Sequence, residues 1–323
     1  MQAQETNGHG ENAAHDNETR DARSPLPIPP PQAGEGDKVP LRESHVKSLE
    51  DWVAFLSQAE IPILKHTARD LAVLHEDAEN ISARGVTDII QRDPMMTVKL
   101  LRYLQHNKHR KQEHEVVLVE QALLMLGVEA FFRKLPPKPL VEESLRGHMA
   151  ALVCLLQVVR RSQRAADYAF DWAVRLRDMH YEEVRIAALL HDLAEILMWC
   201  FAPAEMLKIH AMQQQDKTLR SHDVQEQVLG FPLVDLQLAL AREWALPELL
   251  LTLMDDACAE QTRVRNVILA VNLARHSANG WDDAALPDDY ESIGQLLGMQ
   301  MEDVAVVIGV EEGIVCDIDK PHL

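Results

Sequence analysis

The sequence predicts an all-α protein, a two-lobed bundle of many helices preceded by a disordered N-terminal arm. Three observations support this fold class. Hydrophobic residues make up 47% of the 323 residues, so a sizeable core can form. Residues that favour helices, such as Leu, Ala, Glu and Gln, dominate the composition, and there are only 13 glycines. Apolar residues recur at helical spacing, whereas the N-terminal half shows no strand-like alternation of period two.

The N-terminal arm is expected to span residues 1–43 as an acidic, proline-rich tail. It contains too few apolar residues to offset the entropy lost on ordering. The proline run PLPIPPPQ, residues 25–32, is interpreted as a stiff spacer. The alternative interpretation of this run is a ligand for an aromatic groove. The ordered domain is expected to occupy residues 44–323.

The N-terminal lobe is expected over residues 44–139, ending at the PPKP motif. Asp93 followed by Pro94 is a helix-start signal, because aspartate caps free backbone N–H groups and proline suits the first helical position. Gly127 suits the left-handed end of a helix. Apolar spacing predicts helices over residues 46–57, 65–75, 86–91, 94–107, 119–126 and 128–135.

The second lobe is expected over residues 140–290, followed by C-terminal helices within 291–323. Pro203 and Pro247 each indicate a helix start, and Ser221 with Asp223 indicates an N-terminal cap. The helices predicted here cover residues 144–163, 164–178, 186–201, 203–215, 224–230, 232–244, 248–257 and 264–278, with two short ones in 292–308.

The stretch IAALLHDLAEILMWCF, residues 186–201, is predicted to be a helix buried at the centre of this lobe. Its residues are nearly all apolar, yet His191 and Asp192 stand side by side in its middle. A buried carboxylate without a partner costs several kcal/mol or shifts its pKa. Some group of opposite charge should therefore face Asp192.

Charge and cysteine usage limit the partners and the compartment. Lys+Arg 32 against Asp+Glu 51 gives a net charge of −19, which disfavours nucleic acid and anionic membranes as partners and favours a basic protein. The basic cluster KHRK, residues 108–111, is interpreted as a solvated loop. The four cysteines lack a CxxC spacing and are expected to be reduced thiols of a cytoplasmic protein; they are Cys154, Cys200, Cys258 and Cys316.

Several motifs together resemble the HDOD domain, a variant of the HD superfamily found mostly in bacterial signalling proteins. They are Ile61-Pro62, then IIQRDPMMTVKLLR from residue 89, ALLMLG from residue 122, LLHD from residue 189 and REWALPELL from residue 242. The resemblance covers about residues 51–280. It implies a helical bundle in two lobes, in agreement with the pattern of apolar residues.

The HD superfamily is named for metal-dependent phosphohydrolases, in which a His, a His-Asp pair and a later Asp hold divalent ions that activate water. His191-Asp192 corresponds to the pair. The resemblance also implies where the other ligands should lie, and this sequence departs from the pattern at each place. These positions hold Arg161 where relatives often show His, Pro232 where they often show His, Asp255-Asp256 where they often show His-His, and Arg275 or, in another register, Asn272 where Asp is expected.

We therefore expect Arg161 to face Asp192 and to bind its carboxylate bidentately in place of a metal ion, with Arg275 as a second charge partner. The expected function is a non-catalytic signalling or regulatory module that acts through protein–protein contact, with no catalytic residue, metal or cofactor. One alternative is a metal-dependent phosphohydrolase that uses His191, Asp192 and an atypical ligand such as Asp255 or Asp256. Another is a sensor of a small molecule such as a nucleotide, in the cleft between the lobes.

Overall fold

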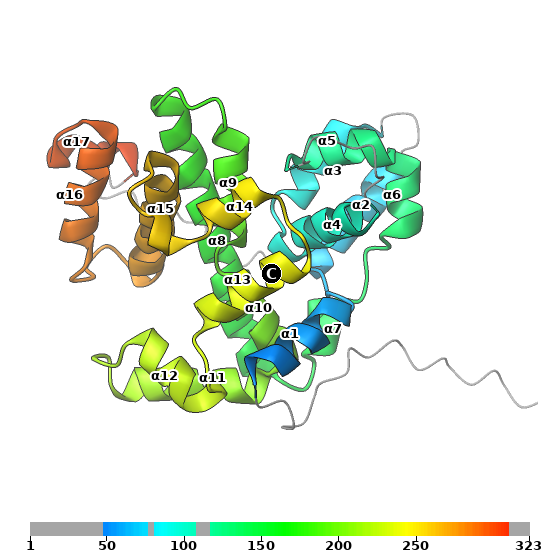
Figure 1. Cartoon of the computed structure of the whole chain (residues 1–323), viewed down its shortest axis with the longest axis horizontal. Helices are drawn as coiled ribbons and strands as arrows, with labels where there is room; N and C mark the ends of the chain where they lie inside the picture. Colours follow the sequence, from blue (N-terminus) through cyan, green and yellow to red (C-terminus); the bar gives the residue numbers. More distant parts are fainter. Residues whose placement is uncertain (1–47, 77–80, 108–116, 310–323) are drawn as a thin grey trace, which may run out of the picture. The chain divides into compact units, whose positions relative to one another are not determined.

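A computed structural model describes residues 48–76, 81–107 and 117–309 of the chain (Figure 1). These residues are mostly helical and contain no β-strand; a single parallel bridge joins Ile63 and Leu140. The all-α prediction is confirmed. The expected arm, the basic cluster at 108–111 and Cys316 lie outside the described residues. The proposed limits of the two lobes remain predictions, and the described residues 48–76, 81–107 and 117–309 fall within one compact unit.

The first half of this unit is built from short helices. They are α1 (Leu49–Gln58), α2 (Lys65–Glu76), α3 (Ala83–Ile90), α4 (Pro94–His106), α5 (Val119–Leu126), α6 (Val128–Lys134) and α7 (Val141–Ser144). The predicted cap at Asp93 is confirmed, since its Oδ1 accepts hydrogen bonds from the backbone N–H groups of Met95 at 2.9 Å and Met96 at 3.0 Å. Its Oδ2 accepts from the N–H of Leu64 at 3.0 Å, which ties the start of α2 to that of α4.

The second half contains the longest helix and the site described below. Its elements are α8 (Met149–Arg175), α9 (Tyr181–Leu190), α10 (Leu193–Phe201), α11 (Pro203–Gln215), α12 (Ser221–Leu229), α13 (Leu233–Glu243), α14 (Glu248–Leu253), the 3-10 turn η1 (Asp256–Cys258), α15 (Thr262–His276), the 3-10 turn η2 (Ser277–Asn279), α16 (Leu286–Leu297) and α17 (Met301–Val307). The helices α8, α9 and α15 lie side by side and pack extensively on one another (Figure 1).

Two local predictions differ from the structure. The predicted segments 144–163 and 164–178 are replaced by one continuous helix, Met149–Arg175, because no glycine or proline occurs between these two residues; Gly147 lies just before the helix. Ser221 is not a cap: Arg220 occupies that position, and Ser221 lies inside α12, where its Oγ accepts a hydrogen bond from Gln213 Nε2.

The central stretch also differs from the prediction of one unbroken helix. It divides at His191 and Asp192 into α9 and α10. An unbroken helix would join the N–H of Ala194 to the C=O of Leu190. Instead, the side-chain amide of Gln237 is inserted between these two groups: its Oε1 accepts from Ala194 N at 2.7 Å and its Nε2 donates to Leu190 O at 2.8 Å. Gln237 comes from α13 and is buried.

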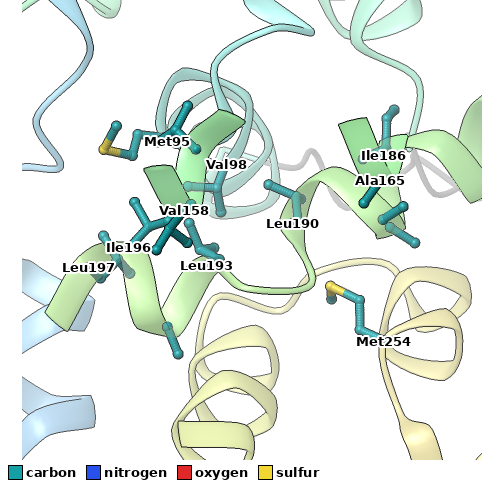
Figure 2. Packing of buried hydrophobic residues seen from close by; sticks show 14 of the residues in the cluster. Met95, Val98, Val158, Ala165, Ile186, Leu190, Leu193, Ile196, Leu197 and Met254 are labelled. Atoms are coloured by element: carbon teal, nitrogen blue, oxygen red, sulfur yellow. The ribbon is translucent and has the colours of Figure 1, made fainter. Parts of the chain in front are cut away.

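The break lies within the hydrophobic core. Figure 2 shows side chains of α4, α8, α9 and α10 around it, with Met254 approaching from the end of α14. Leu190 on one side of the break and Leu193 on the other are both buried. The turn that presents His191 and Asp192 is therefore held by apolar packing on both sides and by one amide in its middle.

Within the described residues, no single helix is long and apolar enough to cross a bilayer. Residues 181–201 pass a test of length and composition only together with α11, and the two segments meet at a bend of 115°.

We expect the substitution Gln237→Ala to lower the free energy of unfolding by about 2–5 kcal/mol, because it leaves two buried backbone groups without partners. Urea denaturation followed by circular dichroism measures this change. The matched control is Gln157→Ala, on an exposed position of α8, which should change the stability by less than about 0.5 kcal/mol. A change for Gln237→Ala as small as that of the control would show that the inserted amide does not maintain the break.

Candidate functional site

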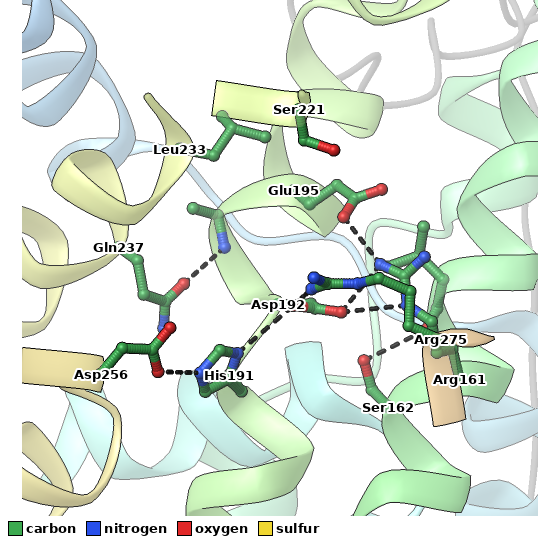
Figure 3. A network of polar contacts seen from close by, with 12 residues as sticks. Arg161, Ser162, His191, Asp192, Glu195, Ser221, Leu233, Gln237, Asp256 and Arg275 are labelled. Carbon is green, nitrogen blue, oxygen red and sulfur yellow. Dashed lines mark hydrogen bonds and ion pairs between the residues drawn. The ribbon is translucent and has the colours of Figure 1, made fainter. Parts of the chain in front are cut away.

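The polar site is centred on Asp192, at the turn between α9 and α10 (Figure 3). Asp192 is buried, with 8% of its surface exposed. Arg161 approaches from the middle of α8 and Arg275 from the last turn of α15. Both approach the carboxylate because the two helices that carry them pack against each other and against α9.

The structure brings both predicted arginines to Asp192. Arg161 Nε and Nη2 donate to Asp192 Oδ2 at 3.1 and 2.8 Å, and Arg275 Nη2 donates to Oδ1 at 3.3 Å. The bonds from Arg161 therefore end on one oxygen, which differs from the expected bidentate pairing with both. The difference arises because Arg275 lies on the other oxygen. The Arg275 side chain is 45% exposed, so solvent weakens its contribution relative to that of Arg161.

A second carboxylate belongs to this network and was missed by the sequence analysis. Arg161 Nη2 also donates to Glu195 Oε2 at 2.7 Å. Glu195 follows Asp192 by three residues, so both side chains project from the start of α10 toward the same neighbouring helix. The separation of three residues between Asp192 and Glu195 was the feature of the sequence that could have indicated this second contact. The Arg161 guanidinium thus lies between two acids, and its side chain is only 16% exposed.

His191 links the turn to a different part of the chain. Its Nδ1 lies 3.4 Å from Asp192 Oδ1, and its Nε2 lies 3.1 Å from Asp256 Oδ1 in η1. The sequence suggests Asp256 only as an atypical metal ligand beside His191 and Asp192, whereas the structure places its carboxylate within hydrogen-bond distance of His191 Nε2. Asp255 does not reach the site, since its side chain accepts from the N–H of Ala257 and caps η1.

Opposite charges in this network stabilise the charged forms of Asp192, His191 and Arg161 and shift their pKa values accordingly. Burial raises the pKa of Asp192, but Arg161, Arg275 and His191 lower it more, so that the pKa lies well below its usual range. Burial lowers the pKa of His191, but the hydrogen bonds and charges of Asp192 and Asp256 raise it to about 9. Burial likewise opposes the charge of Arg161, and Glu195 and Asp192 raise its pKa above the usual value. These shifts favour the charged forms of Asp192, His191 and Arg161 at neutral pH.

The residues present do not fit a divalent metal ion. Both oxygens of Asp192 accept hydrogen bonds from guanidinium groups, and both ring nitrogens of His191 lie next to carboxylates. A cation beside Asp192 would be repelled by Arg161 and Arg275. Among residues 48–76, 81–107 and 117–309, no group of three or more His, Cys, Asp or Glu side chains is arranged to hold an ion. Pro232, at another place where the resemblance implies a ligand, precedes α13 as its cap residue.

Comparison with known proteins identifies the family. The family model of the HDOD domain matches residues 61–258, more than half of the chain. This chain belongs to the HDOD domain family. The matched segment runs from Ile61, ahead of α2, to the end of η1 and includes Arg161, His191, Asp192 and Asp256. No curated protein matches the sequence at a significant level.

Solved structures show the same fold as this HDOD protein. The MmoQ response regulator from Methylococcus capsulatus is 18% identical with a TM-score of 0.58, covering 77% of this chain and 98% of its own. A virulence factor from Campylobacter jejuni is also 18% identical, with a TM-score of 0.57, covering 82% of this chain and 93% of its own. At this identity the likeness concerns the fold alone.

We expect Arg161→Ala to lower the free energy of unfolding by about 3–5 kcal/mol, because it leaves Asp192 charged and poorly compensated inside the protein. Urea denaturation of Arg161→Ala and of the double variant Arg161→Met/Asp192→Leu measures this. The double variant should lose clearly less, since it removes both charges and keeps apolar volume. Equal losses in the two variants would contradict a dominant role for the ion pair.

The charge of His191 predicts a pH dependence of stability. Its pKa in the folded protein is about 9, above the roughly 6.5 of an unfolded chain. The stabilisation is therefore complete below about pH 6.5 and is lost as the pH rises through about 9. Urea denaturation between about pH 6 and pH 10 should show this loss, and His191→Gln should remove it. The exposed Gln157, changed to Ala as a control, should leave the pH profile unaltered, because this substitution removes no titratable group.

Proposed function

We propose that this HDOD protein is a non-catalytic signalling or regulatory module that acts by binding another protein. The observation that supports it is the pairing of Asp192 with Arg161 and Arg275. In an HD phosphohydrolase the corresponding acid would hold the ion that activates water. Here its negative charge is neutralised by the chain's own guanidinium groups.

The network has a structural role in this proposal. It connects α8, α10, α15 and η1 through one set of contacts, and it maintains the turn at the centre of the core. A carboxylate whose two oxygens accept hydrogen bonds from two arginines is poorly placed to hold the ion that would activate water. In this proposal the site that corresponds to the hydrolase centre only holds the helices together, and the function depends on the surface that these helices present.

The partner that this chain favours is a basic protein. The net charge of −19 raises the association rate with a positively charged surface and lowers it with nucleic acid or anionic lipid. Cys154, Cys200 and Cys258 are free thiols, which agrees with the reducing cytoplasm as the compartment in which the module works.

Metal analysis tests this function. We expect the purified wild-type protein to contain no stoichiometric manganese, iron or zinc and to hydrolyse neither bis-p-nitrophenyl phosphate nor cyclic dinucleotides when these ions are added. The double variant Arg161→His/Arg275→Asp replaces both guanidinium groups with metal ligands. It should bind Mn²⁺ in a calorimetric titration in which the wild type shows no binding.

A stoichiometric ion in the wild type that is lost in Asp192→Ala, together with phosphoester turnover, would overturn the proposal. A complementation experiment supplies a readout in cells. The apolar variant Arg161→Met/Asp192→Leu should restore the regulatory phenotype of a deletion strain, because no step of the proposed function uses the Asp192 carboxylate. Failure of a folded, normally abundant variant to restore it would also contradict the proposal.

A further inference from the structure

A cavity of about 500 Å³ lies where α8 ends and where α9 and α15 begin. It is lined by Leu176, Arg177, Asp178, Met179, His180, Thr262, Arg263 and Asn266. The Asp192 network lies away from this cavity, at the middle of α8, after the end of α9 and in the last turn of α15. At a rise of 1.5 Å per residue, Leu176 lies about 22 Å along α8 from Arg161. A volume of this size accommodates a small metabolite.

One buried polar atom at the cavity lacks a partner among the described residues. The amide nitrogen of Asn266 donates to Ala169 O at 3.1 Å, but its Oδ1 accepts no hydrogen bond. Asn266 is 2% exposed and lines the cavity. A buried acceptor in this state is destabilising, and a ligand with a hydroxyl or amino group would satisfy it.

The first turn of α15 supplies hydrogen-bond donors for an anion. The residue before it, Gln261, makes no side-chain cap to the helix. Thr262 and Arg263, the first two residues of this helix, both line the cavity. Free N–H groups and the helix dipole together favour a phosphate or carboxylate at such a helix start, and the Thr262 hydroxyl adds a further donor.

Arg177 lines the same cavity in an unusual backbone conformation. Its φ of 56° is left-handed, and the bonds Asp178 N to Ala173 O and Arg177 N to Val174 O form a Schellman motif at the end of α8. Glycine is the common residue at this position, and α12 and α16 do end on left-handed Gly230 and Gly298. Arg177 adopts this strained backbone conformation and thereby places a positively charged residue at the wall of the cavity.

The acidic group in the cavity does not cancel this charge. Asp178 is held by Arg263, whose Nε and Nη2 donate to its two oxygens at 2.6 and 2.9 Å. His180 contacts Glu183 through Nδ1 at 3.0 Å. Arg177 and the start of α15 remain as positive features without an acidic partner in the lining.

We propose that this cavity binds a small phosphorylated metabolite, with the phosphate between Arg177 and the first turn of α15 and a hydroxyl or amino group of the ligand donating to Asn266 Oδ1. A phosphate is favoured over a carboxylate because its three terminal oxygens can accept from the helix start, the Thr262 hydroxyl and the guanidinium together. This site is independent of the Asp192 network and of the function proposed above.

Thermal shift and isothermal titration calorimetry with inorganic phosphate, AMP and adenosine test the site on the full chain. We expect a saturable rise in melting temperature with AMP, a smaller one with inorganic phosphate and none with adenosine. Sodium chloride at matched ionic strength is the salt control. The proposal is overturned if neither phosphate compound shifts the melting temperature more than this salt does.

Two variants locate the binding and preserve the fold. Arg177→Gly should retain or raise the melting temperature without ligand, because glycine relieves the left-handed strain, yet weaken AMP binding by about tenfold or more. Thr262→Pro removes one N–H and the hydroxyl at a helix position that accepts proline, and should weaken binding similarly. Arg175→Ala, two residues away and outside the lining, should bind within about twofold of wild type. Undiminished AMP binding by Arg177→Gly would place the ligand elsewhere and refute the assignment.

Discussion

The ion pair between Asp192 and Arg161 is the interaction on which the centre of this molecule depends. A carboxylate with 8% of its surface exposed is stable in the ionised form only when compensating charge lies within hydrogen-bond distance. Arg161 supplies that charge from α8, and Arg275 adds to it from α15. The same guanidinium groups would repel a divalent cation at this carboxylate, because they occupy both of its oxygens.

Gln237 gives this ion pair its geometry. By inserting its amide between Leu190 O and Ala194 N, it opens the helix where Asp192 must face α8 and α15. His191 then extends toward Asp256 in η1. Family membership and the solved relatives agree with the helical architecture, and the contacts of Arg161 and Arg275 with Asp192 support the non-catalytic function that we propose.

The helices α8, α9 and α15 carry two polar regions of different character. At the turn between α9 and α10, every charge of the Asp192 network has a partner within the protein. At the end of α8, the cavity is lined by Asn266, whose amide oxygen has no partner among the described residues, and by Arg177, whose backbone is strained. Satisfied polar networks stabilise a fold, and unsatisfied ones indicate a place where a ligand completes the hydrogen bonds. The contrast separates the structural site from the proposed binding site.

The sequence by itself determined the helical class, most helix positions, the cap at Asp93 and the identity of the arginines expected near Asp192. Each of these follows from local spacing, from a short capping signal or from correspondence with a family motif. Only the tertiary structure decided the break at His191, the choice of oxygens on Asp192, the pairing of His191 with Asp256 and the cavity beside Asn266. These features join side chains far apart in the sequence, such as Gln237 with Leu190, and the energy of a buried polar group depends on neighbours that no local pattern specifies.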